Sequence, residues 1–164
     1  MSKDRFAYTL DSFRDIIEDV LRRAREKGAS AAEADVSEGY GQSVTVRCGE
    51  VETIEYNHDK GLGVTVYIGK KKGYASTSDL SPKAIEDTID AALSIARFTA
   101  EDEAAGLADP ELIVRESRDL DLFHPWDISV EEAIELARAC EAAAFRLDPR
   151  VTNSEGATVS AQQS

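Results

Sequence analysis

The sequence predicts an α+β fold, in which a four-stranded antiparallel sheet packs with two helices. Three observations carry this prediction: a one-faced helical pattern ahead of residue 28, alternating strand patterns in residues 33–77, and a helix start signal at Ser81. The expected organisation is an N-terminal α+β domain at residues 1–98, then an acidic linker or surface excursion at residues 99–128. Residues 129–164 supply a helix and a strand that open the next domain, which is truncated.

The first helix is expected between Asp11 and Gly28. Asp11 can cap its start, and Gly28 fits the left-handed conformation that commonly ends a helix. Between them, apolar residues recur at the spacing of a single buried helix face: Phe13, Ile16, Ile17, Val20, Leu21 and Ala24.

The next segment has the two-residue period of β-strands. Val44, Val46 and Cys48 alternate with polar residues, and Gly49-Glu50 is predicted to turn the chain into a strand that reaches Tyr56. This pattern predicts a hairpin as the first half of the sheet.

Glycines and turn-forming residues add detail to this sheet. Gly39 and Gly41 interrupt the first strand, which favours a bulge or a frayed edge. Residues 57–61 are rich in turn-forming types and predict a second turn. The last two strands are then expected at residues 62–68 and 74–77.

The stretch Gly61-Leu62-Gly63 raises the question of a phosphate-binding loop. Such glycines lie between a strand and a helix N-terminus, whereas here they open a strand, and no helix starts before Ser81. The segment is therefore predicted to be a hairpin with Lys70-Lys71-Lys72 at its tip. Three lysines at one tip of an acidic chain are interpreted as keeping the turn soluble and discouraging edge pairing.

Two further helices have capping signals. Ser81 followed by Pro82 predicts a helix start, and Ser129 with Glu132 forms a capping box for a helix that reaches about Leu147. Residues 151–164 look like the beginning of a strand or hairpin with no partner strand in view. The buried stripe of the helix after Ser81 is expected to comprise Ile85, Ile89, Ala92, Leu93 and Ala96.

Composition limits the classes of function. The 164-residue chain has a net charge of −13 at pH 7, which disfavours direct nucleic-acid binding. No apolar run approaches the roughly 20 residues of a membrane span, so no membrane partner is expected. The first residues lack the apolar stretch of a signal peptide, and two cysteines are too few for a disulfide framework. Both observations predict a cytoplasmic protein.

No active site emerges from the residue chemistry. His58 and His124 share no helical face with another ligand, whereas a zinc site needs several converging side chains. Cys48 and Cys140 are interpreted as small buried residues. We therefore assign no catalytic residue, no metal-binding residue and no cofactor to this chain. The sequence does not indicate which residues would bind a substrate.

Several separate motifs resemble the N-terminal domain of the TldD/PmbA metallopeptidase family. They are Ala34-Asp35-Val36, Val46-Arg47, Gly49-Glu50-Val51-Glu52, the run from Lys60 to Val64, and residues 73–81. Residues 100–102, 106–108 and 119–122 are similar to the PmbA branch, also called TldE and formerly modulator of DNA gyrase. Residues 153–160 resemble the opening strand of the family's next domain. We therefore expect the chain to be an N-terminal part of a longer protein.

The resemblance implies a subunit of a cytosolic zinc-dependent peptidase complex that cleaves unfolded or extended peptides. In this family the zinc site belongs to a TldD-like partner subunit, on an HExxxH-type helix that this sequence lacks. The implied partners are a TldD-like subunit and extended peptide substrates, and self-association is also considered. Whether this chain is itself an enzyme stays open.

Two functional hypotheses follow. In the first, the sheet of residues 33–77, with Tyr56 and Tyr67, forms part of a substrate chamber or a subunit contact; alternatively, both tyrosines are ordinary sheet residues. In the second, the chain is an acidic protein-binding module that modulates a DNA-handling enzyme such as gyrase. The acids lie largely on helix surfaces and in residues 101–121, which is more typical of a solvated surface.

Overall fold

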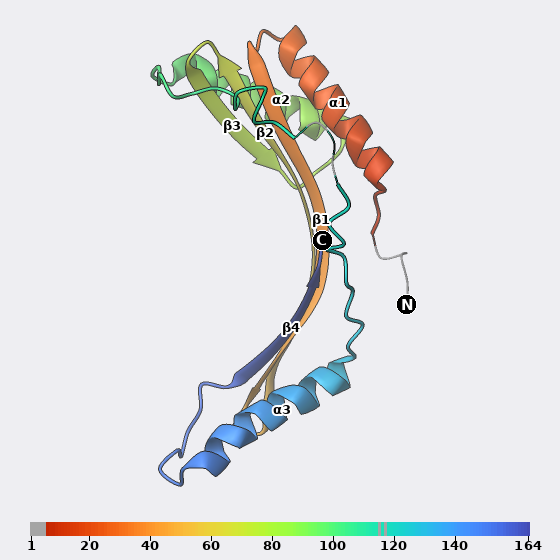
Figure 1. Cartoon of the computed structure of the whole chain (residues 1–164), viewed down its shortest axis with the longest axis vertical. Helices are drawn as coiled ribbons and strands as arrows, with labels where there is room; N and C mark the ends of the chain where they lie inside the picture. The colour runs from red at the N-terminus through yellow and green to blue at the C-terminus, as the bar shows by residue number, and fades with distance from the viewer. Residues whose placement is uncertain (1–5, 115, 117) are drawn as a thin grey trace. The chain divides into compact units, whose positions relative to one another are not determined.

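The computed structural model describes residues 6–114, 116 and 118–164 (Figure 1). The four strands form one antiparallel sheet in the order β3-β2-β1-β4. The predicted α+β class with a four-stranded antiparallel sheet is confirmed. The elements follow in the order α1 (Leu10–Glu26), β1 (Ala31–Arg47), β2 (Glu50–Ile68), β3 (Lys71–Thr77), α2 (Pro82–Phe98), α3 (Val130–Leu147) and β4 (Ala157–Gln163).

Contacts between residues divide the chain into two compact units. Among the described residues, unit 1 comprises Gly39–His58 and Asp121–Ser164, and unit 2 comprises Phe6–Glu38 and Asp59–Leu120. Strands β1 and β2 therefore contribute residues to both units. Helices α1 and α2 belong to unit 2 with β3, whereas α3 belongs to unit 1 with β4. The domain boundaries expected at residues 98 and 128 stay a prediction. The two units group residues by their contacts and combine separate ranges of the sequence, so they do not test boundaries along the chain.

Helix α1 is capped by Thr9 and not by the predicted Asp11. The Thr9 hydroxyl accepts the Ser12 amide at 3.1 Å, and the Ser12 hydroxyl accepts the Thr9 amide at 3.4 Å. Asp11 lies inside the first turn, where it pairs with Arg14 at 2.8 Å. At the other end, Gly28 has a φ of 104° and takes the predicted left-handed conformation.

The turns between the strands differ from the prediction. Cys48 and Gly49 form the first turn with φ values of 50° and 80°, and Glu50 already belongs to β2. The turn expected at residues 57–61 is wrong, because β2 runs without interruption beside the similarly long β1. Pairing with a long neighbouring strand outweighs the local turn preference of this segment.

The fourth strand comes from the C-terminal part of the sequence. β4 pairs with β1 in antiparallel register, with Tyr40 opposite Gln163, so the partner that the sequence did not reveal is β1. β1 is continuous through Gly39 and Gly41, and the expected interruption is therefore wrong. A Cβ at Gly41 would come within 2.6 Å of the Ala161 carbonyl oxygen, so glycine is explained there by the close approach of β4.

Unit 2 has an aliphatic core between its strands and its two helices. Ser81 caps α2 with Pro82 at the first position, as predicted, and all five residues of the expected stripe are buried. α2 approaches β3 so closely that a Cβ at Gly73 would collide with the Ala92 carbonyl oxygen. The fully or almost fully buried aliphatic side chains of this core include Val20, Leu62, Val64, Val66, Ile89 and Leu93.

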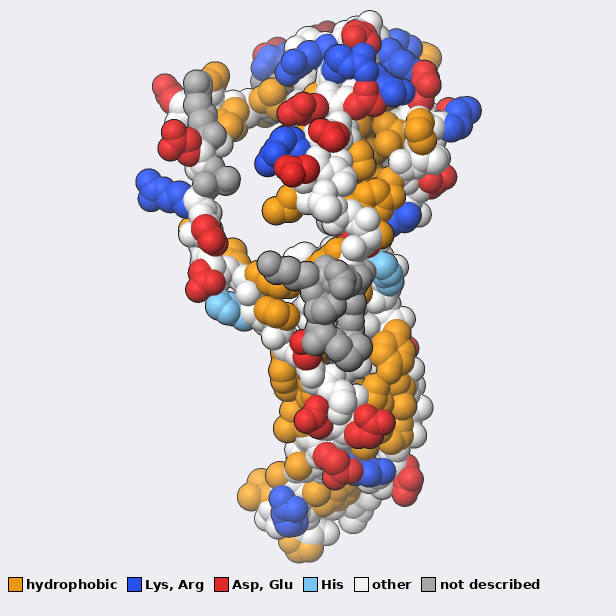
Figure 2. Space-filling model, turned by 90° about the vertical axis from the view of Figure 1, so that its right-hand side faces the viewer, with side chains coloured by type: hydrophobic (Ala, Val, Ile, Leu, Met, Phe, Trp, Pro, Cys, Tyr) orange, Lys and Arg blue, Asp and Glu red, His pale blue; other side chains and the backbone are white. Residues whose placement is uncertain are grey.

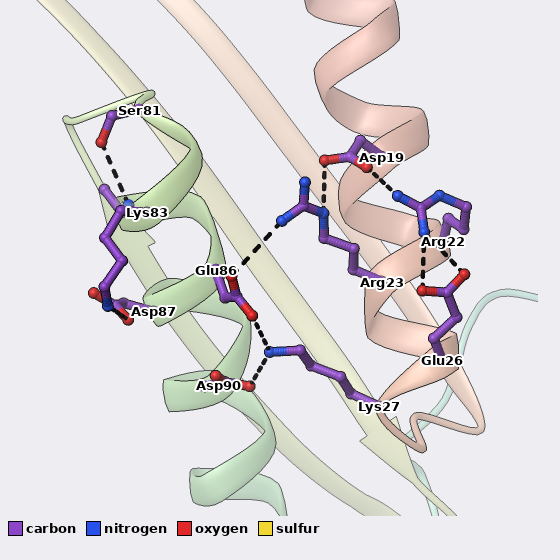
Figure 3. A network of polar contacts seen from close by, with 11 residues as sticks. Asp19, Arg22, Arg23, Glu26, Lys27, Ser81, Lys83, Glu86, Asp87 and Asp90 are labelled. Atoms are coloured by element: carbon purple, nitrogen blue, oxygen red, sulfur yellow. Dashed lines mark hydrogen bonds and ion pairs between the residues drawn. The ribbon is translucent and has the colours of Figure 1, made fainter.

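Ion pairs connect α1 and α2 on their partly exposed sides (Figure 3). Lys27, which caps the C-terminus of α1, contacts Glu86 at 3.1 Å and Asp90 at 2.6 Å on α2, and Arg23 of α1 lies 3.9 Å from Glu86. The hydrogen bond to Asp90 is the main reason that the pKa of Lys27 is raised. Because water reaches these side chains, each pair adds little to stability compared with the core.

The β2–β3 turn anchors the segment that follows α2. The Lys70 ammonium group donates to the Glu103 carbonyl oxygen at 2.8 Å, and the Asp102 amide donates to the Lys70 carbonyl oxygen at 3.0 Å. The predicted hairpin is confirmed, but its tip consists of Gly69 and Lys70 alone, because Lys71 and Lys72 already pair with β2 as part of β3. The described residues between positions 99 and 129 form turns and irregular structure, without helix or strand.

Helix α3 begins with the predicted capping box. The Ser129 hydroxyl accepts the Glu132 amide at 3.1 Å, and the Glu132 carboxylate accepts the Ser129 amide at 2.9 Å. These bonds to Ser129 lower the pKa of Glu132. None of the helices in the described part of the chain is both long enough and apolar enough to cross a membrane.

Candidate functional site

In unit 1, a buried carboxylate on α3 holds the β1–β2 turn. The two oxygens of Glu141 accept the amides of Cys48 and Gly49, each at 2.8 Å. Positive φ values at both turn residues allow successive amides to point at one anion. The Glu141 side chain is only 5% exposed, so α3 places a charge inside unit 1 to bind the turn.

Neighbouring groups keep this carboxylate ionised. A hydrogen bond from Ser154 is the largest cause of the lowered pKa of Glu141; the amides of Gly49 and Cys48 also lower the pKa, and burial opposes them. Arg138 donates its Nε–H to the Gly49 carbonyl oxygen at 3.0 Å. Glu141 is therefore an anchor for the turn at neutral pH and not a proton donor.

A cavity of about 450 Å³ lies in unit 1 beside the paired strands β1 and β4. Tyr40 lies opposite Gln163 and Gln42 lies opposite Ala161, and all four residues line the cavity. Opposed residues of an antiparallel pair point to the same face, so the cavity lies on that face of the sheet. The other lining residues are Gly41, Tyr56, Trp126, Asp127, Ile128, Ser129 and Val130.

Two hydrogen bonds fix the walls of this cavity. The Tyr40 hydroxyl donates to Gln163 Oε1 at 2.5 Å, which joins β1 to β4. The Gln42 amide nitrogen donates to the Ile128 carbonyl oxygen at 2.7 Å, which holds the segment before α3. Three of the eleven lining residues are aromatic, and the volume is in the usual range of ligand-binding cavities.

The outer face of α3 is apolar and exposed. Leu136 is 46% exposed and Leu147 is 87% exposed. Ala139, Cys140 and Ala143 lie between them at helical spacing and are also exposed. A surface helix normally carries polar residues on its outer side, so this apolar α3 face is a candidate contact surface.

Unit 1 is strongly acidic. Its described residues include eleven Asp and Glu against four Lys and Arg. Figure 2 shows acidic side chains in red and basic side chains in blue on one face of the molecule. The field around unit 1 therefore favours positively charged groups.

The two histidines do not converge on a common site. The His58 ring stands edge-on to the Tyr40 ring at 6.5 Å between centroids, and His124 Nε2 lies 2.6 Å from the Asp121 carbonyl oxygen. Within the described residues, no three His, Cys, Asp or Glu side chains are grouped to hold a metal ion. The lack of catalytic and metal-binding residues in the chain as a whole stays a prediction.

The interpretation of both cysteines as buried residues is wrong. Cys48 and Cys140 are exposed thiols. Cys48 belongs to the β1–β2 turn, and Cys140 lies on the apolar α3 face. In the sequence, each cysteine lies at a position where the strand or helix pattern places apolar residues. Such a pattern does not show which face of a strand or helix is covered by another part of the chain.

The two tyrosines of the sheet have different environments. Tyr67, in unit 2, is 4% exposed and donates to Glu33 at 2.7 Å; burial first and this bond second raise its pKa to about 12. Tyr56, in unit 1, is 70% exposed and lines the cavity. Tyr67 is therefore closed off from solvent, whereas Tyr56 is open to it.

Sequence reasoning missed two functional features. Glu141 continues the inner-face spacing of Ala133 and Ala137 on α3, and an acid in such a stripe was a readable signal. Trp126 follows closely on Phe123 in the sequence, but its position beside Tyr40 and Tyr56 depends on the folded chain.

Comparison with known families gives the class of this protein. Residues 32–96 match PmbA/TldA metallopeptidase domain 1, and residues 123–164 match the PmbA/TldA metallopeptidase central domain. The chain belongs to the PmbA/TldD metallopeptidase family, and the resemblance seen in the sequence is confirmed. The family implies a metal, but the described residues do not offer a group of ligands that fits one.

Curated relatives are of the PmbA type. The chain is 49% identical over 150 residues to metalloprotease PmbA of Escherichia coli O157:H7, covering 90% of this chain and 33% of that protein. It is 46% identical over 132 residues to a metalloprotease PmbA homolog of Haemophilus influenzae, covering 80% and 29%. The chain thus spans about a third of the length of these relatives.

Solved structures share the fold. A crystal structure from Bacteroides thetaiotaomicron, described as a candidate modulator of DNA gyrase, has a TM-score of 0.75 at 19% identity, covering 94% of this chain and 39% of that one. TldE from Thermococcus kodakarensis has a TM-score of 0.57 at 21% identity, covering 77% and 30%. These likenesses concern the fold alone.

Proposed function

We propose that the chain is the N-terminal part of a PmbA/TldE-like subunit of a cytosolic zinc-dependent peptidase complex. It supplies a subunit contact and part of the substrate chamber, and a TldD-like partner subunit supplies the zinc. The family assignment and the PmbA-type relatives support this proposal. The observation that carries it is the exposed apolar α3 face, within the residues that match the central domain.

The apolar α3 face suits a protein contact for a physical reason. Leu136 and Leu147 are large apolar side chains that gain free energy on leaving water. The small residues Ala139, Cys140 and Ala143 between them allow another backbone to approach closely. Fully buried interface centres are apolar in this way.

The edges of the sheet support a substrate role. β1 and β2 are the inner strands of the sheet, and β3 and β4 are its outer strands. A peptide could therefore pair with β3 or β4 but not with every strand of residues 33–77. An extended peptide can add to an outer strand through main-chain hydrogen bonds, which tolerates many sequences. The uncharged strand β4 reaches the aromatic cavity through Ala161 and Gln163, so it is the outer strand that we assign to the chamber.

Binding to a TldD-like protein from the same cell tests the proposal. Light scattering after size-exclusion chromatography should detect a complex with the 164-residue chain. The double variant Leu136→Glu/Leu147→Glu should weaken it at least about tenfold, because charges would be buried in an apolar contact. Leu10→Glu is the matched control, since Leu10 is 82% exposed on α1 of unit 2. No complex, or equal weakening by both changes, would contradict the proposal.

The alternative function is an acidic module that modulates a DNA-handling enzyme. The net charge of −13 suits a basic partner surface, and some structural neighbours are described as candidate modulators of DNA gyrase. A supercoiling assay with purified gyrase separates the two functions. Altered supercoiling at stoichiometric chain, without binding to the TldD-like protein, would favour the alternative.

A further inference from the structure

The aromatic cavity of unit 1 brings together three rings from separate parts of the sequence. Tyr40 comes from β1, Tyr56 from β2, and Trp126 from the segment that precedes α3. Tyr56 and Trp126 keep 70% and 51% of their surface exposed, so their ring faces are accessible. Large exposed aromatic side chains around one cavity are costly to leave in water, which points to a ligand.

The chemistry of the lining favours a cation. Aromatic ring faces are negative, and ammonium or guanidinium groups bind to them, most strongly to Trp. Asp127, an acidic residue, also lines the cavity. The surplus of acids in unit 1 raises the local concentration of positive groups.

The walls are also preorganised. Gln163 accepts the Tyr40 hydroxyl, and the Gln42 side chain holds the Ile128 carbonyl oxygen. These bonds use polar groups that would otherwise compete for water, and they fix β4 and the segment before α3 against β1. Ligand binding at such walls costs little ordering of side chains.

We propose that this cavity binds the lysine or arginine side chain of an extended peptide. This inference rests on the proposed function, because it assigns the class of peptide that the subunit favours. A peptide added to the outer edge of β4 presents every second side chain to one face of the sheet. Ala161 and Gln163 lie on the face where the cavity opens, so a side chain of the peptide can enter it.

The tryptophan makes the inference measurable in the chain alone. Trp126 is the single Trp of the sequence, so intrinsic fluorescence reports on the cavity. The probe is Nα-acetyl-lysine N-methylamide, and its norleucine counterpart is the uncharged control with a similar carbon chain. The lysine probe should bind in the millimolar range and about tenfold more tightly than the norleucine probe, because the ring faces attract the charge.

Variants separate the cation site from a general apolar surface. Tyr56→Leu keeps apolar volume and removes a ring face, and it should weaken lysine binding about 3- to 10-fold. Asp127→Asn should weaken it about 2- to 3-fold at low ionic strength and less at high salt. Phe123→Leu is the matched control, since Phe123 is 54% exposed in the same segment but does not line the cavity. It should leave lysine binding unchanged.

The outcomes distinguish this inference from the proposed function. Equal affinity for the lysine and norleucine probes, or unchanged binding by Tyr56→Leu, would overturn the cation site. The titration needs no partner protein and no cleavage, so a chain that binds lysine but no TldD-like protein would overturn only the proposed function. Leu136→Glu lies outside the cavity and should leave lysine binding intact.

Discussion

Unit 1 and unit 2 are each stabilised internally by a different kind of interaction. Unit 2 buries large aliphatic side chains from α1, β2 and α2, among them Val20, Leu62 and Leu93. In unit 1, the buried apolar residues among those described are two valines of β1 and two alanines of α3. Glu141 and Arg138 supply polar bonds to the β1–β2 turn instead.

This difference concerns the cores of the two units more than their surfaces. Unit 2 has a large aliphatic core, although it also exposes large apolar side chains such as Phe98 and Val114. Unit 1 keeps apolar side chains outside, on the apolar α3 face and around the aromatic cavity. Because a thin core stabilises less, unit 1 depends more on specific polar anchors and on what covers its surface.

The core of unit 2 should respond most strongly to substitution. Leu93 is 1% exposed, so Leu93→Ala should lower the free energy of unfolding by about 3 kcal/mol through lost burial and a cavity. Urea denaturation measures this. Leu147→Ala, at an 87% exposed position of unit 1, is the control and should change stability by less than about 0.5 kcal/mol. Similar losses of unfolding free energy in the two variants would contradict the view that unit 2 depends on its aliphatic core.

The anchor of unit 1 should respond locally. Glu141→Gln retains one acceptor oxygen but points an amide group at the second backbone N–H, so Cys48 and Gly49 cannot both be satisfied. Hydrogen exchange in the β1–β2 turn should accelerate roughly tenfold, with little change in unit 2. Glu131→Gln, at an exposed position in the first turn of α3, should leave this exchange unchanged. Equal protection in the Glu141 variant would show that the anchor is dispensable.

Acid should loosen unit 1 through the same group. The pKa of Glu141 is lowered in the folded chain from an ordinary value of 4.5, first by Ser154 and then by the turn amides. A lowered folded pKa means that the stabilisation is present above pH 4.5 and is lost as pH falls through the folded pKa. Turn exchange, corrected for its intrinsic pH dependence, should therefore rise below about pH 4.5 in the natural chain. The rise should be absent in Glu141→Gln, and a rise of equal size in that variant would assign it to another group.

The ion pairs between α1 and α2 should matter least. Lys27→Met removes the contacts with Glu86 and Asp90 but keeps much of the apolar stem, so stability should fall by about 0.5 kcal/mol and less at high salt. Lys71→Met at the start of β3 is the control. A loss of several kcal/mol at Lys27 would place electrostatics, not the aliphatic core, at the centre of unit 2.

Local signals predicted much of the fold. Ser81-Pro82 and the five-residue stripe of α2 define a helix from its own sequence, and the Ser129–Glu132 capping box does the same for α3. The continuity of β2 through residues 57–61 was not predictable, because its turn-forming residues favour a turn until a partner strand is known. The pairing of Tyr40 with Gln163 joins residues far apart in the sequence.

The candidate site was less predictable for the same reason. Tyr40, Tyr56 and Trp126 form one cavity only after β4 has paired with β1 and the segment before α3 has docked. The family resemblance was readable because its motifs are local runs. The cation site and the apolar α3 face required knowledge of which residues remain uncovered.

The pairing of β4 with β1 has a consequence for the order of folding. The β2–β3 hairpin and the adjacent α2 of unit 2 are close in sequence, whereas β4 begins at Ala157 and pairs with residues 40–46. Contacts between distant segments form slowly, because a long loop must close first. We therefore expect a kinetic phase in which unit 2 is native and residues 40–46 of β1 have not yet paired with β4. During synthesis, these β1 residues would stay without β4 until almost the last of these 164 residues had emerged.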